Sequence, residues 1–200
     1  SADILKDIDD DKKKMELLNI IISSSKKMQN IITNILDVNR LETRGIIPKP
    51  QKIIINDLLL QLVNEYKLSA EKKLITLEDN IIQEKITIDT DPELLKQIID
   101  NLLSNAIKYS FNGTKVKVLL EKREQLLLLK IIDAGPGFSK SDMAKIFGKF
   151  QRLSAKPTGG EDSVGLGLFI VKKICDILNI DIRCESEFGK GATFILTIKI

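Results

Sequence analysis

Hydrophobic positions between residues 15 and 42 recur at alternating steps of three and four, which is the spacing of one face of an α-helix. The stripe comprises Leu18, Ile21, Ser25, Met28, Ile32, Ile35 and Asn39, flanked by Ile22, Ile31, Leu36 and Val38. A stripe this broad needs partner helices to cover it, which predicts a helical bundle between chains. A helix packed on its own domain is the alternative. Gly45 and the break at Pro48–Pro50 favour the bundle, because they separate the helix from the remainder of the chain.

A shorter apolar pattern of Ile4, Leu5 and Ile8 precedes this helix. It predicts the end of an earlier helix that turns back through the charged run 9–14. Residues 1–47 are therefore expected to form part of an antiparallel helical hairpin or stalk.

From residue 48 onwards the pattern mixes the periods of helices and strands. A helix is expected from a cap at Asn56 or Asp57 to about Lys73, and another starts at Asp91, which caps it. The expected strands are 52–55, 75–77, 86–88, 114–121, 125–132, 181–186 and 192–199, with further helices over 141–147 and 166–179. This order predicts an α+β fold for residues 48–200, a two-layer α/β sandwich with helices on one face of a mixed sheet.

The composition is typical of a soluble globular domain and does not by itself indicate a function. Hydrophobic residues make up 43% of the chain, charged residues 30%, and the net charge is +3, as in an ordinary soluble domain. Lys and Glu are interspersed, which argues against nucleic-acid binding. The longest apolar runs are shorter than the roughly 18 residues of a membrane helix, so we expect a cytoplasmic fragment without membrane contact, whether or not its parent is membrane-anchored. Cys175 is expected to be a buried apolar residue.

Two polar segments next to predicted elements carry candidate chemistry. Asn101 and Asn105 are four residues apart and share a helix face, and Lys108 lies on the same side. Amide oxygens suit Mg²⁺, and a lysine suits phosphate, although most such pairs of asparagines are simply solvated. The stretch Asp133–Gly137 ends an apolar strand. Its carboxylate suits an exocyclic amine such as that of adenine, and its glycines admit a ring; an ordinary turn is the alternative.

A third segment, Gly165–Leu168, opens a helix after a polar stretch. Free amides at a helix N-terminus bind phosphate, and glycine removes the Cβ that would block it. The segment is not a P-loop, because no Gly-Lys-Ser or Gly-Lys-Thr follows it.

The order and spacing of the three segments resemble the ATP-binding domain of sensor histidine kinases, within the superfamily of gyrase, mismatch-repair ATPases and heat-shock chaperones. Residues 101–109 resemble the N box of that family, 133–137 the G1 box, 146–152 the F box, 165–168 the G2 box and 189–193 the last glycine box. The match covers about residues 50 to 200. Residues 31–42 are similar to the end of the second helix of the family's dimerisation hairpin, which gyrase-like relatives lack.

This resemblance implies ATP and Mg²⁺ as cofactors, with Asn105 as the metal ligand. Asn101, Lys108 and Arg152 would act on the phosphates as catalytic residues, Tyr109 would flank the base or sugar, and Asp133 would select adenine. Residues 151–164 would form a lid over ATP. The remaining implied nucleotide-binding residues are Gly135, Gly137, Phe150, Val164, Gly165, Leu166, Gly167, Leu168 and Thr193.

The chain departs from the family pattern in two ways. Ser163 and Val164 stand where the family has glycine and a hydroxyl residue, which affects the geometry of the lid. The chain also contains no histidine, the residue to which the family transfers the γ-phosphoryl group. We expect that the acceptor helix lies outside this chain, so that the chain alone does not autophosphorylate.

The expected function is that of a protein histidine kinase, with relay to a response regulator and a homodimer in the parent protein. The alternatives are a non-catalytic pseudokinase used for dimerisation or docking, and a gyrase-like ATPase. A gyrase-like ATPase usually needs a glutamate as general base near the position of Asn101, and an asparagine amide cannot act as a general base.

Overall fold

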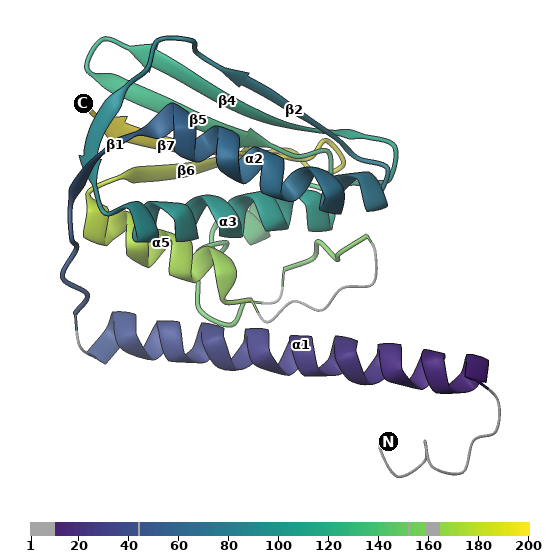
Figure 1. Cartoon of the computed structure of the whole chain (residues 1–200). Helices are drawn as coiled ribbons and strands as arrows, with labels where there is room; N and C mark the ends of the chain where they lie inside the picture. The colour runs from purple at the N-terminus through teal and green to yellow at the C-terminus, as the bar shows by residue number, and fades with distance from the viewer. Residues whose placement is uncertain (1–10, 44, 152, 159–164) are drawn as a thin grey trace.

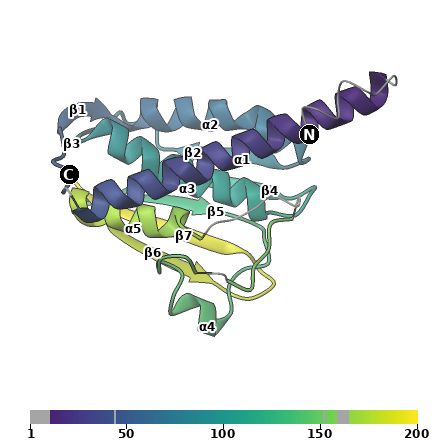
Figure 2. The same ribbon diagram turned by 90° about the horizontal axis from the view of Figure 1, so that it is seen from below.

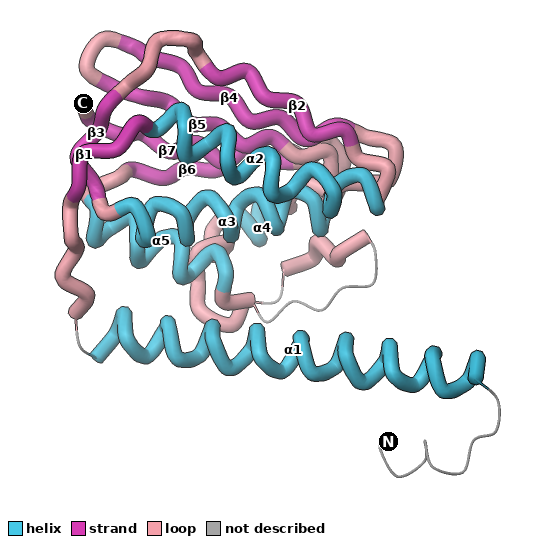
Figure 3. Tube along the Cα trace, viewed as in Figure 1, coloured by secondary structure: helices cyan, strands magenta, loops and turns pink. Residues whose placement is uncertain are grey.

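The computed structural model describes residues 11–43, 45–151, 153–158 and 165–200 and shows a long helix followed by a two-layer sandwich (Figure 1). The elements run α1 (Asp11–Thr43), β1 (Gln51–Ile54), α2 (Ile55–Lys72), β2 (Thr76–Ile81), β3 (Thr87–Thr90), α3 (Pro92–Tyr109), β4 (Lys115–Arg123), β5 (Leu126–Ile132), α4 (Lys140–Met143), α5 (Gly167–Leu178), β6 (Asp181–Ser186) and β7 (Ala192–Lys199). The helices α2, α3 and α5 lie on one face of the main sheet, as Figure 3 shows by its cyan and magenta layers. The predicted α+β sandwich is confirmed.

The main sheet has five strands in the order β2-β4-β5-β7-β6, and β1 and β3 form a separate antiparallel pair. The strands β2 and β4 are parallel, whereas all other neighbours in the main sheet are antiparallel, so the sheet is mixed as expected. One face of each central strand is fully buried against the helices, for example Val118 on β4, Leu129 on β5 and Leu196 on β7. Burying each such side chain stabilises the fold by about 1.5–3 kcal/mol.

Helix α3 begins as the sequence predicted and positions much of the candidate site. The Asp91 Oδ1 atom accepts hydrogen bonds from the backbone N–H groups of Glu93 (3.0 Å) and Leu94 (3.1 Å), and Pro92 follows the cap. The Oδ2 atom accepts from the backbone of Lys49 at 2.8 Å, so the same side chain fixes the linker. The buried face of α3 then runs from Leu94 to Ile107.

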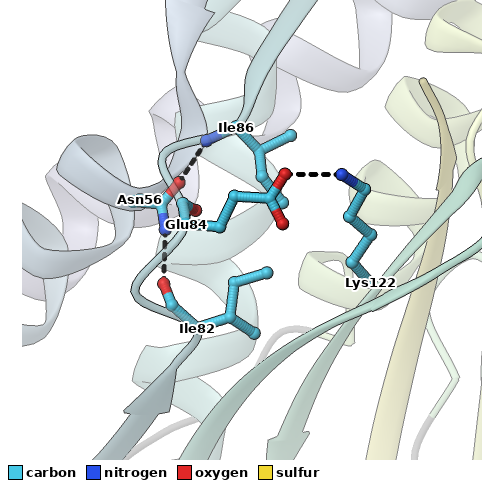
Figure 4. A network of polar contacts seen from close by, with 5 residues as sticks. All are labelled: Asn56, Ile82, Glu84, Ile86 and Lys122. Carbon is cyan, nitrogen blue, oxygen red and sulfur yellow. Dashed lines mark hydrogen bonds and ion pairs between the residues drawn. The ribbon is translucent and has the colours of Figure 1, made fainter.

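Helix α2 does not begin with a side-chain cap, so the predicted cap at Asn56 or Asp57 is wrong. The helix follows β1 directly, and the Ile55 N–H donates to the Ile86 carbonyl at 3.0 Å. Asn56 is buried and donates to the carbonyls of Ile82 (2.7 Å) and Glu84 (3.1 Å), while its oxygen accepts from Ile86 N–H at 2.9 Å (Figure 4). Its side chain therefore ties down the loop between β2 and β3 instead of capping its own helix.

Two other sequence predictions differ from the structure in extent. The predicted helix 141–147 is only the single turn of α4, which Ser139 caps, and the chain then continues in turns and a bend to residue 150. The predicted strand 75–77 extends to Ile81, because β4 offers a parallel partner along its whole length. Cys175 is fully buried in α5, as expected.

The 33-residue helix α1 crosses the open side of the helix layer (Figure 2). Near its C-terminus Val38 is buried, the Asp37 carboxylate accepts from the Gln97 side chain at 2.9 Å, and Glu42 pairs with Lys149 at 2.7 Å. Farther along the predicted stripe, Met28 is 60% exposed and Ile32 is 58% exposed. The C-terminal part of the helix thus packs on its own domain, whereas the stripe farther along keeps an open apolar face. The bundle stays a prediction. The predicted end of an earlier helix, in residues 1–10, lies outside the described residues.

Candidate functional site

The candidate site is a pocket of about 460 Å³ between the ends of α3, β5 and α5. Its volume lies within the range of small-molecule sites. The lining residues are Asn105, Tyr109, Asp133, Pro136, Gly137, Phe138, Ile146, Gln151, Leu153, Ala155, Lys156, Pro157, Gly165, Gly167, Leu168, Ala192 and Phe194. Three polar segments that are far apart in the sequence thus meet in one cavity.

Asp133 provides a carboxylate in a largely apolar wall. Its Oδ1 atom accepts hydrogen bonds from the backbone N–H groups of Gly135 (2.9 Å) and Ala192 (3.1 Å). Within the described part of the chain, the hydrogen bonds that reach this carboxylate all end on Oδ1, which leaves Oδ2 for a ligand. Burial raises the pKa of Asp133 from 3.8 to about 6, against the opposing effect of the two backbone amides. The group is therefore mostly ionised at neutral pH and acts as a fixed acceptor.

The two asparagines of α3 lie against the first turn of α5. The Asn101 side chain donates to the Gln97 carbonyl at 2.9 Å, which fixes its amide. A Cβ atom added to Gly167 would lie 3.0 Å from Asn101 Oδ1 and 3.8 Å from Asn105 Nδ2. Glycine at residue 167 therefore allows the close approach of α5 to the polar side of α3. Asn105 lines the pocket beside this contact.

The start of α5 presents backbone N–H groups to the pocket. Gly165 has a φ of +72°, and a Cβ atom there would lie 2.5 Å from the Gln151 carbonyl oxygen. Only glycine fits this turn without strain. The residue that precedes the helix is Leu166, whose side chain cannot accept from the first helical N–H groups. The Leu166 side chain thus leaves these groups uncapped, and an anion there would be favoured by the helix dipole.

The structure brings seven of the predicted site residues to the pocket wall. They are Asn105, Tyr109, Asp133, Gly137, Gly165, Gly167 and Leu168. Arg152 and Val164 lie outside the described residues, as does the departure at Ser163.

The other predicted site residues lie around the pocket without lining it. Asn101 contacts the start of α5, the Lys108 ammonium lies 5.8 Å from the Tyr109 ring centroid, and Gly135 donates to Asp133. Leu166 is buried, Phe150 is 55% exposed, and Thr193 lies in β7 opposite Ile132.

Sequence reasoning missed most of the apolar wall. Phe138, Ile146 and Phe194 line the pocket, and the rings of Phe138 and Phe194 meet edge to face with centroids 6.3 Å apart. Phe138 follows the predicted glycine turn directly, which was a usable signal. Phe194 gave none, because β7 reads as an ordinary strand until the sheet places it beside β5.

The residues present fit a magnesium nucleotide better than a metal held by protein alone. Among the described residues there is no cluster of three or more His, Cys, Asp or Glu side chains suited to a metal. Asn105 at the pocket wall offers one oxygen, and Mg²⁺ typically completes its shell with phosphates and water.

None of the helices in the described ranges is both long and apolar enough to cross a membrane.

Comparison with known proteins connects this site to a family. Residues 90–200 match the family described as histidine kinase-, DNA gyrase B-, and HSP90-like ATPase. Sensor protein SrrB of Staphylococcus aureus (strain NCTC 8325 / PS 47) is 28% identical over 183 residues, and SrrB of strain MRSA252 is 29% identical over 184. These alignments cover 92% of the chain but 31% of each relative, so the chain spans about a third of their length.

Solved structures share the fold. The catalytic domain of the histidine kinase ThkA is 25% identical, with a TM-score of 0.66, and the match covers 76% of this chain and 95% of that domain. Full-length ShkA in complex with AMPPNP is 23% identical, with a TM-score of 0.79 over 92% of this chain and 38% of that one. The chain therefore belongs to the family of histidine kinase-, DNA gyrase B- and HSP90-like ATPases, among the sensor histidine kinases of two-component systems that its motifs resemble.

Proposed function

We propose that residues 48–200 form the ATP-binding catalytic domain of a sensor histidine kinase, and that residues 1–47 belong to its dimerisation hairpin. The domain would bind Mg-ATP and transfer the γ-phosphoryl group to a histidine outside this chain, for relay to a response regulator. The single observation that carries the proposal is the Asp133 carboxylate, held by two backbone amides in an apolar pocket that also contains the start of α5.

The adenine ring would lie in the apolar part of the pocket, near Ile146 and Phe194. Its amino group would donate to Asp133 Oδ2, because Oδ1 already accepts from the backbone. A guanine would place a carbonyl oxygen against the same carboxylate, and two acceptors repel. The site should therefore select ATP over GTP.

The phosphates would extend toward Gly165–Leu168 and the polar side of α3. Asn105 would bind Mg²⁺, which neutralises phosphate charge when bound, and Asn101 and Lys108 would lie beside the phosphates. Arg152 would stabilise the transferring group electrostatically. Asn101 also argues against a hydrolytic, gyrase-like activity, because its amide donates to the Gln97 carbonyl and cannot activate water as a carboxylate does.

The open apolar stripe of α1 supports a homodimer in the parent protein, since a bundle of partner helices would cover it. The relay to a response regulator is supported by the fold alone. ThkA in complex with the response regulator TrrA is 22% identical, with a TM-score of 0.76 over 98% of this chain and 54% of that one.

Calorimetric titration with Mg-ATP tests the site. The Asp133→Ala variant should bind about 10- to 100-fold more weakly than the wild type, which corresponds to the loss of one hydrogen bond to a charged group. Asn105→Ala should also bind ATP more weakly than the wild type, and this loss of affinity should be seen only when Mg²⁺ is present. Asp89→Ala and Asn80→Ala, which change exposed strand residues, are matched controls. Unchanged affinity in both site variants would disprove the proposed site.

The kinase step needs a second assay. The chain is mixed with a helical hairpin that carries a histidine, taken from the longer parent protein, and labelled ATP. We expect label on the hairpin with the wild-type chain and much less with Asp133→Ala when the ATP concentration lies below the Kd of the variant. Binding of ATP without any transfer would leave the nucleotide site intact and refute the kinase assignment.

A further inference from the structure

One wall of the pocket, the segment 153–158, is attached to the rest of the domain at two points. Leu153, Ala155, Lys156 and Pro157 line the pocket. The two hydroxyl residues of the segment, Ser154 and Thr158, instead form hydrogen bonds to the body of the domain. The lining residues Ala155, Lys156 and Pro157 are therefore held between two anchors.

The first anchor joins Ser154 to α4. The Ser154 hydroxyl donates to the Asp142 carboxylate, which also accepts from the hydroxyl of Ser139 at 2.8 Å and is buried. Asp142 is the N3 residue of a capping box with Ser139, so its position is fixed by α4 itself. Ser154 thus attaches the segment to a capped helical turn rather than to another loop.

The second anchor joins Thr158 to the end of α3. The Thr158 N–H donates to the Lys108 carbonyl at 3.2 Å, and its hydroxyl donates to the Ser110 carbonyl at 2.6 Å. Lys73, the residue that follows α2, places its ammonium in the same cluster. It donates to Thr158 Oγ1 (2.9 Å) and to the carbonyls of Ile107 (3.0 Å) and Lys108 (2.8 Å). A cation at these last carbonyls also interacts favourably with the helix dipole.

The same end of α3 holds the strand end that carries Asp133. The Ser110 hydroxyl accepts from the Ala134 N–H at 3.1 Å, and the Phe111 N–H donates to the Ala134 carbonyl at 3.3 Å. The anchor of the segment and the acceptor for the base are therefore fixed to one helix end. A change at Thr158 alters the wall and leaves these contacts of Ala134 in place.

We propose that Lys73 and Thr158 are positioning residues for the nucleotide, which keep the segment 153–158 in place as a preformed wall of the pocket. Lys73 is not among the residues that line the pocket. An unanchored segment would have to lose backbone freedom when the nucleotide binds, and that cost would weaken the affinity. This inference rests on the proposed nucleotide site and adds two residues to it that the family motifs in this sequence do not include.

The test compares Thr158→Val, which keeps the shape and removes the hydroxyl, with Thr158→Ser, which keeps the hydroxyl. If only about 10–20% of the valine variant keeps the segment 153–158 in its anchored position, the Kd for Mg-ATP rises about five- to tenfold. Thr158→Ser should bind like the wild type. Hydrogen exchange should become faster in residues 153–158 of the valine variant and stay unchanged in α3. Thr87→Val, an exposed strand substitution, is the matched control.

Lys73→Met and Ser154→Ala extend the test to the other partners. Lys73→Met and Thr158→Val break the same contact, so the double variant should bind only slightly more weakly than the weaker single variant. Ser154→Ala acts at the other anchor and should weaken the affinity for Mg-ATP. It provides an independent test in case Thr158→Val does not fold. Unfolding by urea shows which variants are folded.

The inference is overturned if Thr158→Val and Ser154→Ala bind Mg-ATP like the wild type, or if Thr158→Ser is as weak as Thr158→Val. Asp133→Ala, titrated in parallel, separates this failure from that of the proposed function. When Asp133→Ala loses affinity and the anchor variants do not, only the positioning role is wrong. When the wild type itself does not bind nucleotide, both proposals are wrong.

Discussion

Replacing Asp133 by asparagine should make the nucleotide-free protein more stable while it weakens nucleotide binding. Asparagine has the same shape, and its oxygen can accept from the backbone N–H groups of Gly135 and Ala192 as Oδ1 does now. The substitution removes the buried negative charge and places an NH₂ group where Oδ2 lies, on the side of the pocket. The carboxylate is therefore retained at a cost to stability, as expected for a group that recognises a ligand.

The size and pH dependence of this gain follow from the pKa of Asp133. Burial raises the pKa from 3.8 to about 6, so the folded protein binds this proton more tightly than the unfolded chain does. The wild type should therefore lose stability as the pH rises from about 4 to about 6, and then lose no more through this group. The shift corresponds to about 3 kcal/mol. The Asp133→Asn variant has no such group to titrate, so its gain over the wild type should be about this amount at pH 8 and almost nothing below pH 4.

Urea unfolding at a series of pH values from about 4 to about 8 measures the effect. The chain has no tryptophan, so far-ultraviolet ellipticity is the suitable signal. Asp142→Asn is a control of opposite sign. Hydrogen bonds from Ser154 and Ser139 lower the pKa of Asp142 below 3.8, so its charge stabilises the fold, and this contribution is lost only as the pH falls below the unfolded pKa and through the folded pKa. Asp142→Asn should therefore be less stable than the wild type by an amount that stays nearly constant from about pH 5 to about pH 8.

The reasoning would be refuted by a difference between wild type and Asp133→Asn that does not change with pH, or by a variant that is less stable at pH 8. The binding half of the prediction is checked by titration with Mg-ATP at pH 8. The asparagine NH₂ group would face the amino group of adenine, and two donors repel. We therefore expect a more stable protein that binds ATP more weakly.

Two further substitutions test the fold and the start of α5. Asn56→Ala removes three hydrogen bonds between α2 and the loop 82–86 and leaves buried backbone groups without partners. The free energy of unfolding, measured in urea, should therefore fall by about 2–4 kcal/mol. Asn64→Ala, on the exposed face of the same helix, is the control and should cost less than about 1 kcal/mol. Gly165→Ala places a Cβ against the Gln151 carbonyl at a positive φ, so it should weaken the affinity for Mg-ATP about tenfold or more. Gly113 also has a positive φ, but a Cβ there has no neighbour within 4 Å. Gly113→Ala should therefore leave the affinity unchanged.

The sequence allowed the recognition of this site because short-range rules govern its parts. Asp91 and Pro92 mark the start of α3 by local capping chemistry, which is independent of the rest of the fold. The asparagines of α3 share a face through helix geometry alone. For Asn56 the same rule gave a wrong result, because a capping side chain bonds elsewhere when a buried loop offers it more partners.

By itself, the sequence determined the order of helices and strands, the three polar segments and their family resemblance, since each depends on residues close together in the chain. Only the tertiary structure showed that Phe194 of β7 completes the pocket beside Asp133, since strand pairing joins residues that are far apart in the sequence. It also decided that Lys73 and Thr158 meet at the end of α3, because side-chain contacts across 85 residues depend on how the layers pack. Local pattern thus identified the chemistry, and long-range packing determined the shape and rigidity of the site that holds it.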